Sequence, residues 1–307
     1  MLADKLLQAF PSTRVYTGVS SNLGHHSSYP AVDRPVVLAG SGRCGSTLVQ
    51  SILNTNSDFL IWGEHNGFLR QIAAAYYGAN HPYFPDKSNL DAAERIKRLR
   101  DPRHWPAWDN LCGHVAFLET FRTFVRSLFA DPTRQALRWG FKEIRYGHDA
   151  EDQTLKFLFE CFPETCLLIL VRLPEPTIFS MLSRWAFGDR RKGDIDPQEI
   201  DQHILLAAES WNSRYSHLAA AFHIYELQCR ILRYEDLQNH ETYRGLAEFL
   251  ETDSFDFARC LRRVRDVSNK TDATARLIRQ RMELLAPKVA AVTSQARALY
   301  YAGGVAA

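Results

Sequence analysis

The sequence predicts an α/β fold built on a doubly wound parallel sheet. The apolar run 36–39 leads into a glycine-rich turn and then into a helical pattern, which is typical of the first strand of an open parallel sheet. A second apolar run, 167–171, shows no alternation, as expected of a central strand covered on both faces. Strand and helix patterns continue to alternate as far as a strand at 229–233, so the sheet is expected to be parallel.

The elements are expected to form a single domain of residues 1–307. Residues 1–34 are interpreted as an N-terminal extension, and a strand at 59–62 follows the glycine-rich turn and its helix. The stretch 62–139, rich in Tyr, Phe and Trp, is interpreted as an insertion over the bound ligand. Further elements are expected at 92–100, 114–129, 139–142, 151–161, 177–185, 197–222, 240–250 and 255–264, with two closing helices at 274–285 and 288–301.

The glycine-rich turn predicts a phosphate site. Gly40 and Gly45 have the spacing of a nucleotide-triphosphate loop, but Ser46 stands where that loop carries its lysine. The cation is Arg43, on the turn itself, which suits a 5′-phosphate bearing a charged leaving group better than a triphosphate with magnesium. Such a turn directs backbone N–H groups and a helix dipole at one anion. The residues expected to contact it are Ser41, Gly42, Arg43, Cys44, Gly45, Ser46 and Thr47.

A second anion site is expected beyond the strand 167–171. Arg172 ends this strand, and Ser180 follows eight residues later in a helical pattern that also carries Arg184. An arginine fork and a serine hydroxyl in this arrangement can converge on one phosphate. The alternative for Arg172 is an ordinary ion pair at a strand end.

Acid–base residues are expected at the same edge of the sheet. Glu64 lies just past the strand 59–62, where open α/β sheets place ligands, and it is a candidate base. Its alternative is an acidic residue at a helix N-terminus. His65 is the second candidate base, although a lone histidine is more often structural. Lys142, just past a short strand, is a candidate donor to a transferred group, or else a surface lysine.

Together these segments resemble the P-loop sulfotransferases, which use 3′-phosphoadenosine 5′-phosphosulfate (PAPS). The glycine-rich turn resembles their 5′-phosphosulfate loop, the segment from Arg172 to Arg184 resembles their 3′-phosphate site, and 231–237 is similar to the strand and turn that follow. Similarity is greatest to the tyrosylprotein sulfotransferases and their bacterial relatives, at 43–48, 63–64, 140–143, 180–184, 211–212 and 234–235. Residues 173–175 depart from the usual pattern, which leaves the acceptor open.

The resemblance implies a P-loop sulfotransferase fold with a helical insertion and a metal-independent enzyme. Such an enzyme moves the sulfuryl group of PAPS to a hydroxyl of a peptidyl tyrosine, a carbohydrate or a small-molecule alcohol or phenol, and releases 3′-phosphoadenosine 5′-phosphate (PAP). Glu64 would be the base, Arg43 and Lys142 would stabilise the leaving group, and 62–139 would form much of the acceptor pocket. Tyr234 would flank the adenine unless it is simple core, and Lys270 would reach the 3′-phosphate unless it is solvated.

Two other classes remain open. A P-loop nucleotide kinase would share the sheet and the loop, but the missing loop lysine counts against it. A non-catalytic module that binds 3′-phosphoadenosine nucleotides would keep Arg172 and Ser180 and would tolerate loss of Glu64. Sulfate transfer to any acceptor separates the proposed enzyme from both.

Bulk properties fit a cytoplasmic enzyme with no membrane span. Animal members of the branch it resembles are anchored in the Golgi, so the resemblance implies a bacterial protein or a trimmed form of an anchored one. A homodimer is a possible partner state. The formal net charge of +2 does not indicate nucleic-acid binding. The six cysteines are scattered without metal-site spacing, so we expect no metal and reduced thiols. Cys44 is a candidate reactive thiol because it precedes a helix N-terminus.

Overall fold

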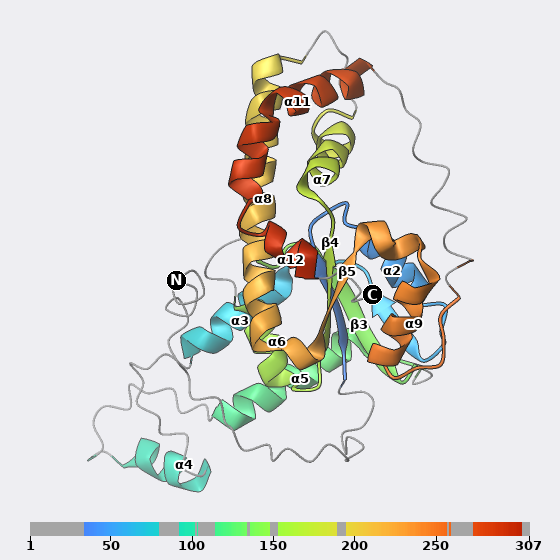
Figure 1. The fold of residues 1–307 in the computed structure, drawn as a ribbon. Helices are drawn as coiled ribbons and strands as arrows, with labels where there is room; N and C mark the ends of the chain where they lie inside the picture. The colour runs from blue at the N-terminus through green and yellow to red at the C-terminus, as the bar shows by residue number, and fades with distance from the viewer. Residues whose placement is uncertain are drawn as a thin grey trace.

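The computed structural model describes residues 34–79, 92–101, 103, 114–133, 136–147, 153–188, 195–256, 258 and 273–302 (Figure 1). Its centre is a five-stranded parallel sheet in the order β2-β3-β1-β4-β5, so the predicted doubly wound sheet is confirmed. The strands are β1 (Val36–Gly40), β2 (Phe59–Trp62), β3 (Arg138–Glu143), β4 (Cys166–Val171) and β5 (Cys229–Arg233).

β1 lies at the centre of the sheet, and the chain winds outward from it in both directions. All five of its residues are buried, which explains the apolar run without alternation. Gly140 of β3 lies so close to β1 that an added Cβ would be 1.9 Å from the carbonyl oxygen of Val36. The topology therefore opens a crevice outside the carboxyl ends of the central strands, the usual ligand position in such sheets.

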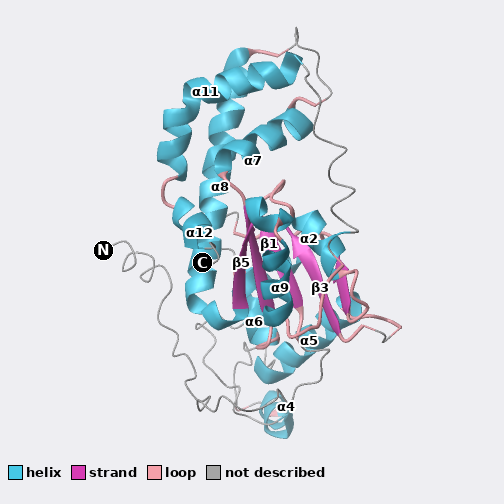
Figure 2. Cartoon of the chain, turned by 45° about the vertical axis from the view of Figure 1, so that its right-hand side comes forward, coloured by secondary structure: helices cyan, strands magenta, loops and turns pink. Residues whose placement is uncertain are grey.

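Helices cover both faces of the sheet (Figure 2). One core joins the sheet to one set of helices, which are α3 (Phe68–Ala79), α5 (His114–Phe129), α6 (Thr154–Cys161), α8 (Pro197–Ile224) and α12 (Arg297–Ala302). A second core joins the opposite face to α2 (Ser46–Leu53) and α9 (His240–Phe249). The sheet is thus held rigid between two apolar layers.

A helical lobe extends beyond the carboxyl end of β4 (Figures 1 and 2). It consists of α7 (Pro174–Met181), the π-helical turn η2 (Leu182–Ala186), the upper part of α8, and α11 (Ala273–Thr293). The lobe has its own apolar core, in which Ile178 of α7, Ile204 of α8 and Val289 of α11 are buried. This lobe packs the helix that follows Arg172 into a fixed position.

The two closing helices predicted at 274–285 and 288–301 are wrong in their boundaries. α11 runs through Pro287 to Thr293, and the shorter α12 follows it. A proline inside a helix removes one backbone hydrogen bond. Apolar packing of Leu285 and Val289 on either side, together with the Arg281–Asp201 ion pair to α8, keeps the helix continuous. The helix expected at 255–264 lies almost wholly outside the described residues.

The predicted insertion contributes to the core where it is described. Tyr76 of α3 and Val125 and Phe129 of α5 are buried against the sheet, and α4 (Ala92–Arg100) stands apart in Figure 1. Much of the aromatic-rich part lies outside the described residues, as do residues 1–33, so the acceptor-pocket role of 62–139 stays a prediction. None of the helices in the described part of the chain has the length and apolarity to cross a membrane.

Candidate functional site

The glycine-rich turn joins β1 to α2 through left-handed backbone conformations. Arg43 has φ 67° and Gly45 has φ 91°. An added Cβ at Gly45 would lie 2.7 Å from Leu237 and 2.8 Å from Tyr234, so glycine is required there on both counts. Gly45 caps α2 without any side-chain hydrogen bond. The turn therefore presents its backbone and the positive end of α2 to the crevice.

Tyr215 of α8 holds the turn from below, a contact that the sequence did not reveal. Its hydroxyl lies 3.1 Å from both the amide nitrogen and Oγ of Ser41 and donates to the Leu170 carbonyl oxygen at 2.7 Å. Ser41 is buried and is absent from the pocket lining given below, so it supports the turn from behind. The shape of the turn is thus fixed before any ligand binds.

Cys44 also lies behind the turn, where it packs into the core beside α2. Its side chain is buried, and burial raises the pKa of the thiol above its ordinary value. The expectation that Cys44 is a reactive thiol is therefore wrong. Removal from water outweighs the effect of the helix N-terminus.

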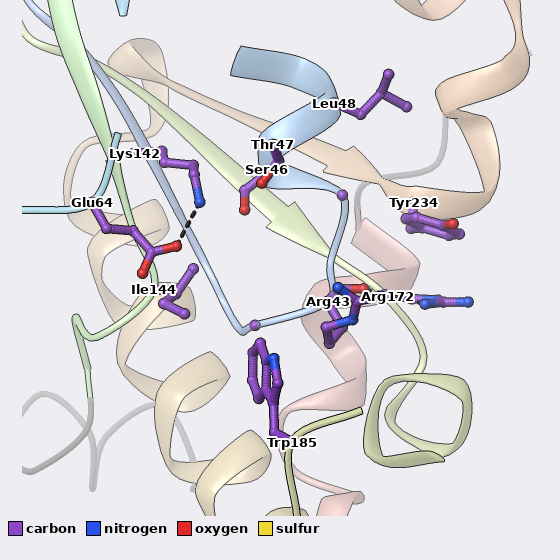
Figure 3. A pocket seen from close by; sticks show the side chains of 12 residues that line it. Arg43, Ser46, Thr47, Leu48, Glu64, Lys142, Ile144, Arg172, Trp185 and Tyr234 are labelled. Atoms are coloured by element: carbon purple, nitrogen blue, oxygen red, sulfur yellow. Dashed lines mark hydrogen bonds and ion pairs between the residues drawn. The ribbon is translucent and has the colours of Figure 1, made fainter. Parts of the chain in front are cut away.

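A pocket of about 200 Å³ opens in front of the turn (Figure 3). Its walls come from the glycine-rich turn and the first turn of α2, from the ends of β2, β3 and β4 with the loops that follow them, from η2, and from the turn after β5. The lining residues are Gly42, Arg43, Gly45, Ser46, Thr47, Leu48, Glu64, Lys142, Ile144, Arg172, Trp185 and Tyr234. Segments far apart in the sequence thus meet at the carboxyl ends of the strands.

One side of the pocket is cationic. Arg43 donates from Nε to Ser180 Oγ at 3.0 Å, which brings the turn and α7 together. Burial lowers the pKa of Arg43, and the nearby charges of Arg184 and Arg172 lower it further. In the described part of the chain no carboxylate pairs with any of these three arginines. Such a concentration of unbalanced positive charge favours an anionic ligand.

Arg172 is held in place by three contacts around its strand end. Its guanidinium lies 3.9 Å above the Tyr234 ring, and Nη1 donates to the Arg43 carbonyl oxygen at 3.2 Å. Trp211 Nε1 donates to the Arg172 carbonyl oxygen at 3.2 Å. The Nε atom of Arg172 is buried and has no hydrogen-bond partner. The side chain is therefore oriented while it keeps donors to spare for a ligand.

The opposite side of the pocket carries a carboxylate between two cations. Lys142 Nζ lies 2.5 Å from Glu64 Oε1, and Arg145 Nη1 lies 3.1 Å from Glu64 Oε2. Figure 3 shows the Glu64–Lys142 pair across the pocket from Arg43 and Arg172. Burial alone would raise the pKa of Glu64, but its bonds to Lys142 and Arg145 lower the pKa below its usual value. Glu64 is thus ionised at neutral pH.

His65 points away from the pocket although it is next to Glu64 in sequence. Its Nε2 lies 2.7 Å from the Tyr146 hydroxyl, and its ring packs edge-on against Phe68 and Phe141. Burial lowers the pKa of this histidine despite the carboxylate of Glu143 nearby. These contacts favour the structural alternative for His65.

Besides Tyr215, four residues of the site were not predicted. Leu48, Ile144 and Trp185 line the pocket, and Arg145 contacts Glu64 from outside the lining. Trp185 stands on the π-helical turn and covers Gly42 so closely that an added Cβ would be 2.3 Å from its indole ring. In the sequence, the one sign that Trp185 belongs to the site is that this large aromatic residue directly follows Arg184. Lys270 lies outside the described residues.

A family model described as the sulfotransferase family matches residues 35–256. No curated protein sequence matches the chain. Among solved structures, sulfotransferase STF9 from Mycobacterium avium is 12% identical with a TM-score of 0.45, and covers 85% of this chain and 77% of its own.

Two further structures are similar to a comparable degree. A sulfotransferase from Alicyclobacillus acidocaldarius is 15% identical with a TM-score of 0.46, and covers 87% of this chain and 96% of its own. The sulfotransferase domain of the Synechococcus PCC 7002 olefin synthase is 15% identical with a TM-score of 0.44. It covers 82% of this chain and 94% of its own.

Proposed function

The chain belongs to the sulfotransferase family, and we propose that it transfers the sulfuryl group of PAPS to a hydroxyl acceptor and releases PAP. The observation that carries this proposal is the division of one pocket into two sides. Unbalanced arginines and a glycine-rich turn form one side, and an ionised carboxylate paired with lysine forms the other.

The residues present fit a 3′,5′-bisphosphate nucleotide. The buried Nε of Arg172 lacks a partner, and no carboxylate within the described residues neutralises the arginines around it. We assign Arg172, Ser180 and Arg184 to the 3′-phosphate, and the turn with Ser46 and Thr47 to the 5′-phosphate. Tyr234 lies under Arg172 at the edge of the pocket, where it would flank the adenine.

Glu64 is assigned as the base. When bound, PAPS supplies a sulfuryl group on a phosphate that is ready to leave. Glu64 accepts the proton of the acceptor hydroxyl while the new O–S bond forms. Because its pKa is lowered, Glu64 is a weak base, so this proton moves favourably only once bonding to sulfur has made the acceptor oxygen acidic.

Arg43 and Lys142 are assigned to the leaving group. Charge grows on the phosphate oxygen as the O–S bond to it breaks, and cations already in place stabilise that charge without reorganisation. Lys142 is buried and bonded to Glu64, so it joins the two sides of the reaction. Sulfuryl transfer requires the attacking oxygen, the sulfur and the leaving oxygen to lie in line.

Three classes of acceptor fit this proposal, which are a peptidyl tyrosine, a carbohydrate and a small-molecule alcohol or phenol. The acceptor class is identified by measuring transfer of radiolabelled sulfate from PAPS to a panel of compounds from each class, with Glu64→Gln as the inactive control. Binding of PAP without transfer to any acceptor would indicate a non-catalytic module. Magnesium-dependent turnover of ATP would instead support a kinase.

A further inference from the structure

Glu143, the last residue of β3, is a fully buried carboxylate that joins two loops of the site. Its Oε2 accepts from the backbone N–H of Gly67 at 2.8 Å, at the end of the loop that carries Glu64. Its Oε1 accepts from the backbone N–H groups of Ile144 at 2.8 Å and Arg145 at 3.1 Å. One side chain therefore fixes the loop after β2 to the loop after β3.

The same carboxylate also orients the Arg145 guanidinium. Nη1 of Arg145 lies 2.9 Å from Glu143 Oε1 and 3.1 Å from Glu64 Oε2, so this nitrogen bridges the two carboxylates. Arg145 is not among the residues that line the pocket, and its side chain is 42% exposed. It therefore contacts Glu64 without lining the pocket.

Resting on the proposed function, we propose that Glu143 and Arg145 are positioning residues that hold the base Glu64 in place and keep it ionised. Lys142 contacts Glu64 within the pocket, where the proposed function also assigns it to the leaving phosphate. When Lys142 donates its N–H groups to the leaving oxygen, its hydrogen bond to Glu64 weakens. Arg145 does not donate to the leaving group, so its hydrogen bond still orients the Glu64 carboxylate toward the acceptor.

The loop that carries Glu64 is anchored on both sides of a tight turn. Asn66 and Gly67 both have positive φ, at 61° and 71°, so the loop makes a tight turn directly after the base. His65 is anchored in the aromatic core on one side of this turn, and Glu143 holds the amide of Gly67 on the other. Without the second anchor, the loop that carries Glu64 would be held by His65 on one side only, and Glu64 itself by its bonds to Lys142 and Arg145.

Several charged groups face Glu64, and the experiment must separate their effects. Lys142 lies in β3 and Arg145 in the loop after it, Arg43 and Arg172 lie across the pocket, and His65 adjoins Glu64 but is buried. Arg145→Met removes one positive charge and both ion pairs but keeps the aliphatic stem. Arg145→Lys keeps the charge but replaces the planar guanidinium with an ammonium group.

The first measurement titrates the Glu64 carboxylate by NMR in protein labelled with carbon-13 at glutamate side chains, and uses Glu64→Gln to assign its signal. We expect the midpoint to move to higher pH in Arg145→Met and to stay close to wild type in Arg145→Lys, because a nearby positive charge favours the ionised form. Arg281→Met, which breaks an ion pair with Asp201 between α11 and α8, is the matched control and leaves the midpoint unchanged.

The second measurement is turnover with PAPS and an acceptor found in the panel. Arg145→Met should lower kcat by about 10-fold with little change in the KM for PAPS, and the acid limb of the rate profile should move with the NMR midpoint. The double variant Glu64→Gln with Arg145→Met should be no slower than Glu64→Gln alone, since Arg145 acts through Glu64.

An unchanged Glu64 midpoint in Arg145→Met would overturn the positioning role, whatever the acceptor proves to be. Full activity of Glu64→Gln would instead overturn the base assignment, and the NMR result would then still report whether Arg145 holds this carboxylate. Arg145 is partly exposed, so the variant is expected to fold. An unaltered affinity for PAP verifies that it does.

Discussion

Arg172→Ala is the perturbation that tests the nucleotide site most directly. We assign Arg172 to the 3′-phosphate, so this variant should lose discrimination between adenosine 3′,5′-bisphosphate and AMP, which lacks that phosphate. Arg172 also stacks on Tyr234 and bonds the turn, so some effect on any nucleotide is expected. The AMP measurement isolates that general effect.

The magnitude follows from the donors that Arg172 has available. Of its five N–H groups, one bonds the Arg43 carbonyl oxygen, while Nε has no partner. A charge-assisted pair at a partly exposed site is worth about 2 kcal/mol, or about 30-fold in Kd. At a ligand concentration of about 100 times the wild-type Kd, ligand stabilisation falls from about 2.7 to about 0.9 kcal/mol.

Thermal unfolding monitors this loss without any acceptor. At about 2 °C per kcal/mol for a chain of this size, the shift in Tm caused by the bisphosphate should fall from about 5 °C to about 2 °C. The shift caused by AMP should change far less. Arg281→Ala, an ion-paired arginine on α11, is the control and should keep the wild-type difference.

The reasoning would be refuted if Arg172→Ala still distinguished the bisphosphate from AMP by the wild-type margin. The same holds if wild-type protein responded equally to both nucleotides. In either case the 3′-phosphate site, and with it the choice of PAPS over ATP, would have to be abandoned.

Three further predictions concern catalysis and the sheet. Arg43→Ala should lower turnover by about two to three orders of magnitude while PAP affinity, by titration calorimetry, changes less; normal turnover would remove Arg43 from the mechanism. Glu64→Gln should lower turnover by roughly two to four orders of magnitude. Its pH–rate profile should lack the acid limb, in which wild-type activity falls as Glu64 is protonated. A variant with a near wild-type rate would exclude Glu64 as the base. In urea unfolding, Gly140→Ala should lower the free energy of unfolding by about 3 kcal/mol, because its Cβ meets the Val36 carbonyl oxygen. Gly78→Ala has open space around it and should raise the free energy of unfolding by up to about 1 kcal/mol. Equal effects of the two substitutions would contradict the backbone-contact argument.

The sheet and the glycine-rich turn were predictable because their signals are local. The unalternating runs that became β1 and β4 reflect burial on both faces, and the turn between β1 and α2 is written in consecutive residues. The strand ends then carried Glu64, Lys142 and Arg172 to one edge, since parallel strands share their carboxyl ends.

The supporting contacts were not predictable because they depend on tertiary packing. Tyr215 reaches Ser41 from a helix 174 residues further along the chain, and nothing near Ser41 announces it. Trp185 reaches Gly42 through a π-helical turn, whose wider winding breaks the spacing that a sequence pattern assumes. Arg145 gains its place only because β3 lies beside β2.

The strand ladder sets the span across which the proposed reaction occurs. Glu64 follows β2, Lys142 belongs to β3, and the turn follows β1, so three adjacent strands carry the two sides of the pocket. Adjacent strands lie about 4.8 Å apart, so β2 and β1, with β3 between them, are separated by about 10 Å. A slip of β2 by one residue would displace Glu64 by about 3.3 Å and turn it to the other face. The hydrogen-bond register of the sheet therefore sets the distance between Glu64 and the glycine-rich turn.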